Sequence, residues 1–387
     1  MKTLRSGRNR RKWIYVLLLM GLLGLSGCGS PSSASVEMSS QTELVKTGSM
    51  ELQYAENFAV DYYEDGYKML ITLPDSKRYL LVPEGQPVPG GLDEDVSILQ
   101  EPLQNIYLVA SGVMDMFASV DAVDQIRFSG QKQENWYIQT AKDAMAAGDM
   151  IYAGKYSKPD YELLVSEGCD LAIENRMITH SPEVVEMLQS FDIPVMIEYS
   201  SYEQHPLGKV EWVKFFGTLT GKEAEAEEAF AEQTEILEKV ESGEKTGKTI
   251  AFFYVTSNGL IQVRQSTDYI PKLIELAGGR YMFEDLEDSG SGRSTLNMQV
   301  EDFYAGAKDA DILIYNSSID GGVTTLDELI GKCNILKDFK AVQEGQVYCT
   351  TNDMYQQSMA IGYLLQDMHT VLTDDDTAKL RYLFLLQ

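Results

Sequence analysis

The chain has 387 residues, with 59 acidic and 32 basic side chains and a formal net charge of −27 at pH 7. So acidic a chain argues against nucleic acid as a partner, because binding to phosphate needs a basic surface. The charge fits a protein that stays dispersed in an extracytoplasmic compartment. The length exceeds what one hydrophobic core usually serves, so we expect two lobes.

Residues 1–27 have the organisation of a secretory signal. The opening MKTLRSGRNRRK is basic, and the apolar run at 13–25 is too short to span a bilayer. The run ends in LSGC at 25–28, which resembles a bacterial lipobox. This resemblance implies cleavage before Cys28 and acylation of its thiol, which would hold the protein on the outer face of the plasma membrane. The alternative is an ordinary signal peptide that contains a cysteine.

The next segments separate the signal from the first lobe. Residues 28–50 are rich in Ser and Thr and poor in large apolar side chains, so we expect a lipidated, flexible tether. Residues 54–83 alternate in the manner of strands joined by turns. We assign residues 51–205 to the first lobe with these extra strands, and the role of 51–100 stays open.

Short apolar strands then alternate with helical segments in two series. The strands IYLVAS (106–111), QIRFSG (125–130) and PVMIEY (194–199) belong to the first series. TIAFFYV (249–255) opens the second. Strands that alternate with helices predict a mostly parallel sheet with helices on both faces, and hence an α/β fold.

Residues 206–242 separate the two series and hold no strand pattern. Gly217 and Gly221 divide this segment into two helices, and the second repeats its apolar residues at helical spacing. We therefore expect an interdomain helix here, followed by a second lobe at 243–387.

No residue pattern predicts a catalytic centre, a metal site or a cofactor. Cys169, Cys333 and Cys349 form no C-x-x-C, and pairing of Cys333 with Cys349 stays open. The three His residues are widely spaced, and G-x-S-x-G is absent from the sequence. His205 has two interpretations, as a residue that shapes a helix entry or as an axial ligand to haem iron or cobalt.

Two segments about 140 residues apart share one design. They are PDYELLVSEGCDLAIEN (159–175) and VEDFYAGAKDADILIYN (300–316). Each has an acidic residue at the start of a helical run and an Asp five residues before an Asn. Such a repeat suggests one helix–strand piece from each of two similar lobes.

This order of segments resembles the ABC-transporter substrate-binding proteins of the rigid-helix class, which bind siderophores, haem or cobalamin. The resemblance covers roughly residues 100–372 and also rests on VASGVMDMFASVDAVDQIRFSG and IPVMIEYSSYEQHPLGKVEW. It implies two Rossmann-like α/β lobes joined by one long helix, with the ligand in the cleft between them. It further implies that one exposed acid on each lobe pairs with Arg residues of a permease. Glu162 matches that position in the first lobe, and Asp302, with Glu301 beside it, in the second. The alternative is that these acids only favour the helix dipole.

Ligands of open α/β sheets lie beyond the carboxyl ends of the strands, which selects candidate residues. The principal candidates are Trp136, Asn175, Arg176, Tyr199, Tyr202, Arg264, Tyr269, Arg293, Asn316 and Tyr355. Further candidates are Ser111, Glu174, His205, Ser257, Asn258 and Asn352. Arg side chains and aromatic rings suit a bulky ligand with acidic edges.

We therefore expect a lipid-anchored, monomeric receptor of an ABC importer that binds a ferric-siderophore-type chelate and delivers it to the permease. A corrinoid or haem is the alternative cargo. A lipid-anchored sensor is a distant alternative, and an enzyme is not expected.

Overall fold

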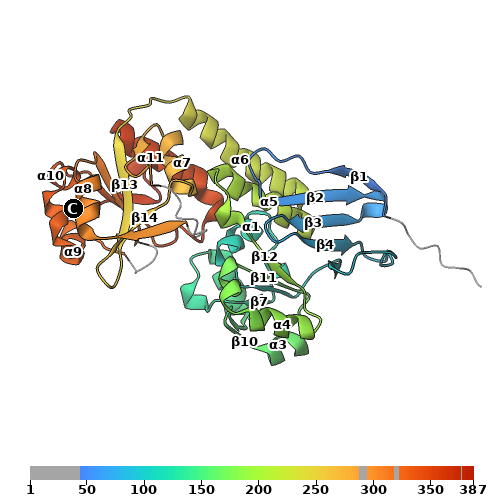
Figure 1. The fold of residues 1–387 in the computed structure, drawn as a ribbon. Coiled ribbons are helices and arrows are strands. Elements are labelled where there is room, and N and C mark those ends of the chain that lie inside the picture. The colour runs from blue at the N-terminus through green and yellow to red at the C-terminus, as the bar shows by residue number, and fades with distance from the viewer. Residues whose placement is uncertain (1–43, 287–293, 318–321, 376) are drawn as a thin grey trace, which may run out of the picture. The chain divides into compact units, whose positions relative to one another are not determined.

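The computed structural model describes residues 44–286, 294–317, 322–375 and 377–387. Strands of this part of the chain form four sheets, two of which carry the α/β lobes that the sequence predicts (Figure 1). Cys28 of the lipobox and the candidate Arg293 lie outside the described residues.

The N-terminal sheet is separate from the sheet of the first lobe. It consists of β1 (Lys46–Ser49), β2 (Phe58–Tyr63), β3 (Lys68–Thr72), β4 (Lys77–Val82) and β5 (Val96–Gln100), in that order. Only β4 and β5 are parallel. β1 lies inside the segment expected to be a tether, so that expectation is wrong for its four residues. Composition did not indicate the strand because β1 is held by backbone pairing with β2 while its side chains are exposed.

The first lobe has an all-parallel sheet of order β12-β11-β6-β7-β8. Its strands are β6 (Ile106–Leu108), β7 (Phe128–Ser129), β8 (Ile151–Tyr152), β11 (Leu171–Glu174) and β12 (Val195–Ile197). Its helices are α1 (Met114–Ser119), α2 (Gln139–Ala147), α3 (Tyr161–Ser166) and α4 (Pro182–Ser190). A small hairpin of β9 (Gly154–Lys155) and β10 (Lys158–Pro159) precedes α3.

The second lobe has a mixed sheet of order β16-β14-β13-β17-β18-β19, with β15 also pairing β13. The strands are β13 (Thr249–Val255), β14 (Ile261–Arg264), β15 (Arg280–Tyr281), β16 (Thr295–Met298), β17 (Ile312–Tyr315), β18 (Val347–Thr350) and β19 (Leu383–Leu385). The helices are α7 (Tyr269–Leu276), α8 (Val300–Ala307), α9 (Leu326–Lys332), α10 (Lys340–Gln343) and α11 (Ile361–Thr373). β13, β17 and β18 are parallel, and antiparallel strands flank them.

Two helices, α5 (Pro206–Thr220) and α6 (Glu223–Glu241), link the lobes and pack against each other (Figure 1). They are separated at Gly221, which has a φ of +71°. Gly217 does not divide them, contrary to the prediction. It lies inside α5, where a Cβ atom would be only 2.5 Å from Cβ of Ala226, so the glycine permits close approach of α6.

The main hydrophobic core surrounds α5 and joins the N-terminal sheet to both lobes. Every residue of α5 from Pro206 to Leu219 is buried. Phe58 of β2 packs its ring against Trp212 and Phe215, with centroids 4.9 and 5.3 Å apart. The N-terminal sheet is therefore an integral part of the fold.

Candidate functional site

The candidate site lies where the strand order of the first lobe reverses. From β6 the chain adds β7 and β8 on one side and β11 and β12 on the other, so a crevice opens beyond the carboxyl ends of β6 and β11. A cavity of about 260 Å³ occupies this place. It is lined by Ala110, Ser111, Gly112, Asn175, Arg176, Met177, Glu198, Ser201, Tyr202, Lys209 and Tyr355.

A second cavity, of about 340 Å³, adjoins the first and shares Ser111 and Asn175 with it. It extends over the ends of β7 and β8, where Lys132 and Lys155 line it. A larger hollow of about 600 Å³ lies elsewhere, beside α7 and the amino end of β13. Since ligands of such sheets bind at the carboxyl ends, the two adjoining cavities form the candidate site.

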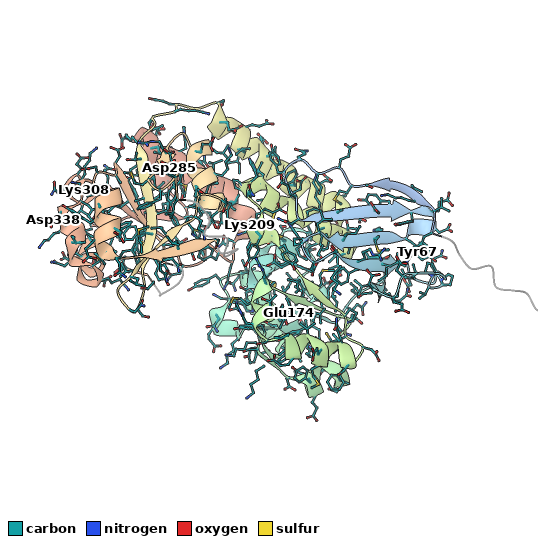
Figure 2. The ribbon with its side chains drawn as sticks, in the orientation of Figure 1. Tyr67, Glu174, Lys209, Asp285, Lys308 and Asp338 are labelled. Atoms are coloured by element: carbon teal, nitrogen blue, oxygen red, sulfur yellow. The ribbon has the colours of Figure 1, made fainter. Side chains whose placement is uncertain are left out.

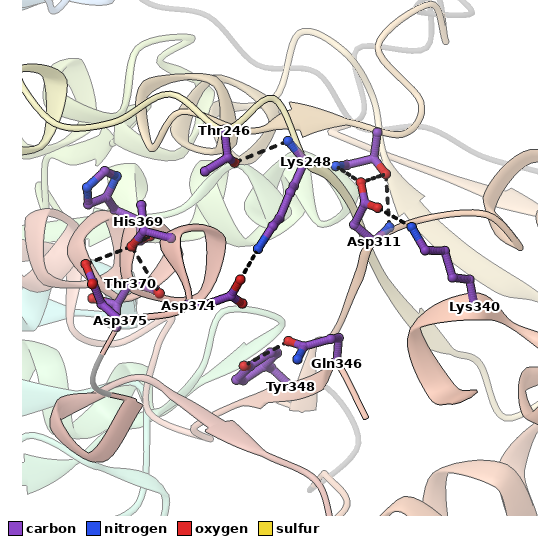
Figure 3. Close-up of polar contacts among 12 residues, drawn as sticks. Thr246, Lys248, Asp311, Lys340, Gln346, Tyr348, His369, Thr370, Asp374 and Asp375 are labelled. Carbon is purple, nitrogen blue, oxygen red and sulfur yellow. Dashed lines mark hydrogen bonds and ion pairs between the residues drawn. The ribbon is translucent and has the colours of Figure 1, made fainter. Parts of the chain in front are cut away.

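The repeated segments position this site by the same device in both lobes. Asp170 accepts hydrogen bonds from the backbone N–H groups of Gln104 and Asn105, immediately before β6. Asp311 accepts bonds from the N–H and hydroxyl of Thr249 at the start of β13, and Lys340 pairs with it (Figure 3). Each Asp thus fixes the entry of a central strand to its neighbour.

The Asn residues of the repeat lie at the opposite ends of the same strands. Asn175 accepts a hydrogen bond from Met177 N–H and so turns the chain beyond β11. Asn316 donates to the hydroxyl of Tyr355 over 2.8 Å. Tyr355 lines the first cavity, so Asn316 supports a cavity residue from behind.

Arg264 and Tyr269 also lie behind the cavity lining. The Arg264 guanidinium is 5.4 Å from the ring centroid of Tyr355 and 3.4 Å from the carboxylate of Asp268. The ring of Tyr269 lies under the ammonium of Lys209, 4.8 Å from it. These two candidates therefore face residues of the site.

The rim of the first cavity contains a cation stacked on an aromatic ring. The Arg176 guanidinium lies 4.8 Å from the ring centroid of Tyr202, and both side chains are exposed. The ring of Tyr199 is 6.3 Å from that of Tyr202, but Tyr199 is mostly buried. Of the principal candidates, the structure thus gathers Asn175, Arg176, Tyr202 and Tyr355 at the cavity.

Trp136 does not reach the site. Its indole is 1% exposed, and its N–H donates to the hydroxyl of Ser129 in the core of the first lobe. Its ring cannot stack on a ligand without leaving that core. His205 caps α5 through a hydrogen bond from Leu207 N–H to Nδ1 and stacks on Tyr54, which agrees with its interpretation as a helix-entry residue.

The sequence analysis missed three polar residues near the cavity floor, Glu198, Lys209 and Asp115. Lys209 is 4% exposed and Glu198 is 6% exposed, and both line the cavity. Burial raises the pKa of Glu198 and raises that of Asp115 to about 6. No sequence signal distinguished Lys209, because Glu211 and Lys214 are charged residues of the same helix.

Glu174, labelled in Figure 2, is a buried residue at the end of β11, and its carboxylate has no hydrogen-bond partner among the described residues. Its burial raises its pKa to about 8, so the side chain holds a proton at neutral pH. It does not line either cavity.

The segment 353–359 of the second lobe connects directly to the first lobe beside the cavity. The side-chain amide of Gln356 accepts a hydrogen bond from Tyr137 N–H and donates one to the carbonyl of Asn135, both over 2.8 Å. Asp115 accepts a bond from Met359 N–H. These contacts fix Tyr355 relative to the first lobe.

The three acids expected at a permease contact are exposed. Glu162 is in the first turn of α3, and Glu301 and Asp302 are in the first turn of α8. Their role in docking stays a prediction. Among the described residues, Cys169, Cys333 and Cys349 form no disulfide, so Cys333 and Cys349 are not bonded to each other.

The comparison with protein families decides the class of this site. A family model described as "Periplasmic binding protein" matches residues 109–354, which includes most of both lobes and the cavity residues except the most C-terminal one. The chain belongs to the periplasmic binding protein family. This family is a non-enzymatic, extracytoplasmic class that binds solutes for ABC transporters. The predicted family and the α/β fold class are confirmed.

One relative and two solved structures show what else the chain resembles. An uncharacterized lipoprotein of Methanocaldococcus jannaschii, MJ0878, is 24% identical, and the match covers 93% of this chain and 92% of the relative. A possible iron-binding protein from Staphylococcus epidermidis superposes with a TM-score of 0.54 at 17% identity, over 70% of this chain and 98% of the other. The haem-binding protein HutB of Vibrio cholerae gives 0.55 at 14% identity, over 69% and 98%.

The coverage of these periplasmic binding proteins sets the N-terminal sheet apart. The two solved structures are matched almost completely, while nearly a third of this chain is left over. The family match begins at residue 109, after β1–β5. The sheet therefore lies outside the segment that the family model matches.

The described ranges lack two further features. No group of three or more His, Cys, Asp or Glu residues in those ranges is arranged to hold a metal ion. Within the same ranges, none of the helices is both long and apolar enough to cross a membrane.

Proposed function

We propose that this periplasmic binding protein captures a ferric-siderophore-type iron chelate and delivers it to the permease of an ABC importer. The observation that carries the proposal is the cavity at the switch point, where Arg176 stacks on Tyr202 and Tyr355 faces them from the second lobe. Aromatic rings can lie against the flat faces of a chelate, and cationic groups can bind its acidic edges. The structural neighbours described as iron- and haem-binding support the same class.

The proposal includes the membrane and the permease as partners. Acylation of Cys28 anchors the chain, as the lipoprotein relative supports. Glu162 on α3 and Asp302 on α8, with Glu301 beside it, dock on the two halves of the permease. Charge pairs at such a contact mostly set the encounter rate and orientation. Delivery needs no second subunit of this chain, so the receptor acts as a monomer.

Thermal shifts of residues 29–387 test the cargo. We expect a ferric siderophore at 100 times its dissociation constant to stabilise the fold by about 2.7 kcal/mol. Haem, cobalamin and cobinamide are the comparison ligands. A thermal shift with a corrinoid or haem and none with an iron chelate would show that the proposed cargo is wrong. The proposed receptor function would still stand.

Charge reversal tests the docking acids. The double variant Glu162→Lys with Asp302→Lys is expected to lose uptake of labelled chelate in cells but to bind the chelate as the natural chain does. The control reverses the exposed residues Glu228 and Glu238 of α6, which changes the net charge equally. Equal uptake of the labelled chelate by cells with either variant would contradict docking through these acids. It would favour a sensor, whose role needs no permease.

A further inference from the structure

Lys209 is the polar residue that the proposed function leaves without a role. It lies in the first turns of α5, where Figure 2 labels it, and this helix is buried along almost its whole length. Lys209 also lines the first cavity. Its side chain thus reaches from the central helix to the cavity floor. Its ammonium carries three donors, and at the cavity these donors can meet acceptors of a bound molecule.

Lys209 has no carboxylate partner within the described ranges of the chain. No carboxylate oxygen there lies within 4.0 Å of its ammonium, and its close neighbour is the ring of Tyr269, 4.8 Å away. Lys214 on the same helix provides the comparison. It is equally buried, but its ammonium lies 3.0 Å from Glu227 and 3.6 Å from Glu211.

The carboxylates nearest to Lys209 are held by other donors. Glu198 accepts from the N–H and the hydroxyl of Ser200. Asp115 accepts from a backbone N–H, and Asp268 accepts from a backbone N–H and pairs with Arg264. Burial raises the pKa of all three acids, and the positive charge of Lys209 acts against that rise in each of them.

We infer that Lys209 binds an anionic oxygen group of the cargo and thereby selects chelates with a negative charge. This inference rests on the proposed function and narrows it. Carboxylate- and catecholate-type ferric chelates satisfy the ammonium, and Arg176 at the rim adds a second positive charge at the same cavity. A neutral trihydroxamate chelate or the cationic cobinamide leaves the buried ammonium unpaired, and binds less well for that reason.

The stability of the ligand-free protein gives the first test. The variant Lys209→Met removes an unpaired buried charge, so we expect its melting temperature to equal or exceed that of the natural chain. Lys214→Met is the matched control and is expected to melt lower, because it leaves Glu211 without its ammonium. If the melting temperature of Lys209→Met falls as far as that of Lys214→Met, Lys209 is a structural counter-charge. This result would overturn the inference.

Binding gives the second test. We expect Lys209→Met to weaken ferric citrate and ferric tricatecholate by about 10- to 100-fold, the loss of one hydrogen-bonded charge contact. Lys209→Arg should restore most of this loss, and a neutral ferric trihydroxamate should bind Lys209→Met at least as tightly as it binds the natural chain. Two results would refute selection by charge. One is an equal loss of affinity of Lys209→Met for charged and neutral chelates. The other is tighter binding of the neutral chelate than of the charged ones by the natural chain.

Stabilisation by metal-free citrate tests this inference independently of the proposed function. If no iron chelate binds, the proposed cargo is wrong, but citrate should still stabilise the natural chain more than Lys209→Met. If citrate stabilises both equally or neither, the inference fails as well.

Discussion

The carboxylate of Glu211 is predicted to hold the N-terminal sheet against the rest of the protein. It lies on α5, fully buried, and accepts hydrogen bonds from the backbone N–H groups of Gln53, Tyr54 and Ala55, at distances from 2.8 to 3.1 Å. These residues lead from β1 into β2. One side chain thus fixes a segment that is more than 150 residues distant in the sequence.

The cost of removing this carboxylate follows from its contacts. A hydrogen bond to a charged group contributes about 1.5–3 kcal/mol, and Glu211→Ala removes the acceptor of three donors. Two of those donors are only partly buried and can bond to water in the variant. The loss is therefore smaller than the sum of three hydrogen-bond contributions. The variant also takes from Lys214 one of its two carboxylates. We expect a loss of about 3–5 kcal/mol, and about half of it for Glu211→Gln, which retains one acceptor.

Urea denaturation of residues 29–387, followed by tryptophan fluorescence, measures the loss. Limited proteolysis shows whether cleavage then begins at residues 50–57. Glu228→Ala is the control, since Glu228 is exposed on α6 and its loss should change stability by no more than about 0.5 kcal/mol. An unfolding midpoint and a cleavage pattern for Glu211→Ala that match those of Glu228→Ala would refute the anchoring role.

Two further predictions concern Glu174 and the helix pair. Because the folded pKa of Glu174 is raised to about 8, its contribution to stability is complete below the unfolded pKa of about 4.5 and is lost as the pH rises through 8. Glu174→Gln should therefore flatten the fall in melting temperature between pH 5 and pH 8.5, and an unchanged pH profile would contradict the raised pKa. Gly217→Ala should lower the free energy of unfolding by about 1–3 kcal/mol, because its Cβ would clash with Ala226. Gly331→Ala, a helical glycine with open space around it, should be neutral or stabilising in the same denaturation assay, and equal effects would exclude the clash.

The sequence by itself determined the type and order of most elements. The alternation of apolar strands with helical periods predicted both α/β series, because those periods are local properties of the chain. The repeat of Asp170–Asn175 and Asp311–Asn316 predicted equivalent strands in the two lobes, and the structure assigns them to β11 and β17. Asn175, Arg176, Tyr202 and Tyr355 were within reach of this reasoning because strand ends mark the ligand side of such sheets.

Tertiary structure alone decided which of those side chains meet. Trp136 follows a strand as Tyr202 does, yet it is buried against Ser129, because the packing of its own lobe covers it. Likewise, β1 owes its conformation to pairing with β2, and Gly217 continues its helix because α6 packs closely there. A local pattern cannot report such contacts.

The same reason explains why Lys209 escaped the sequence analysis. A lysine near the start of a helix usually faces water. Here α5 is buried along almost its whole length, so the lysine is enclosed, and it lines the cavity beside Tyr202 and Tyr355. The fold class of this periplasmic binding protein was thus readable from local pattern, whereas the charge that faces its cargo depended on contacts between segments distant in the sequence.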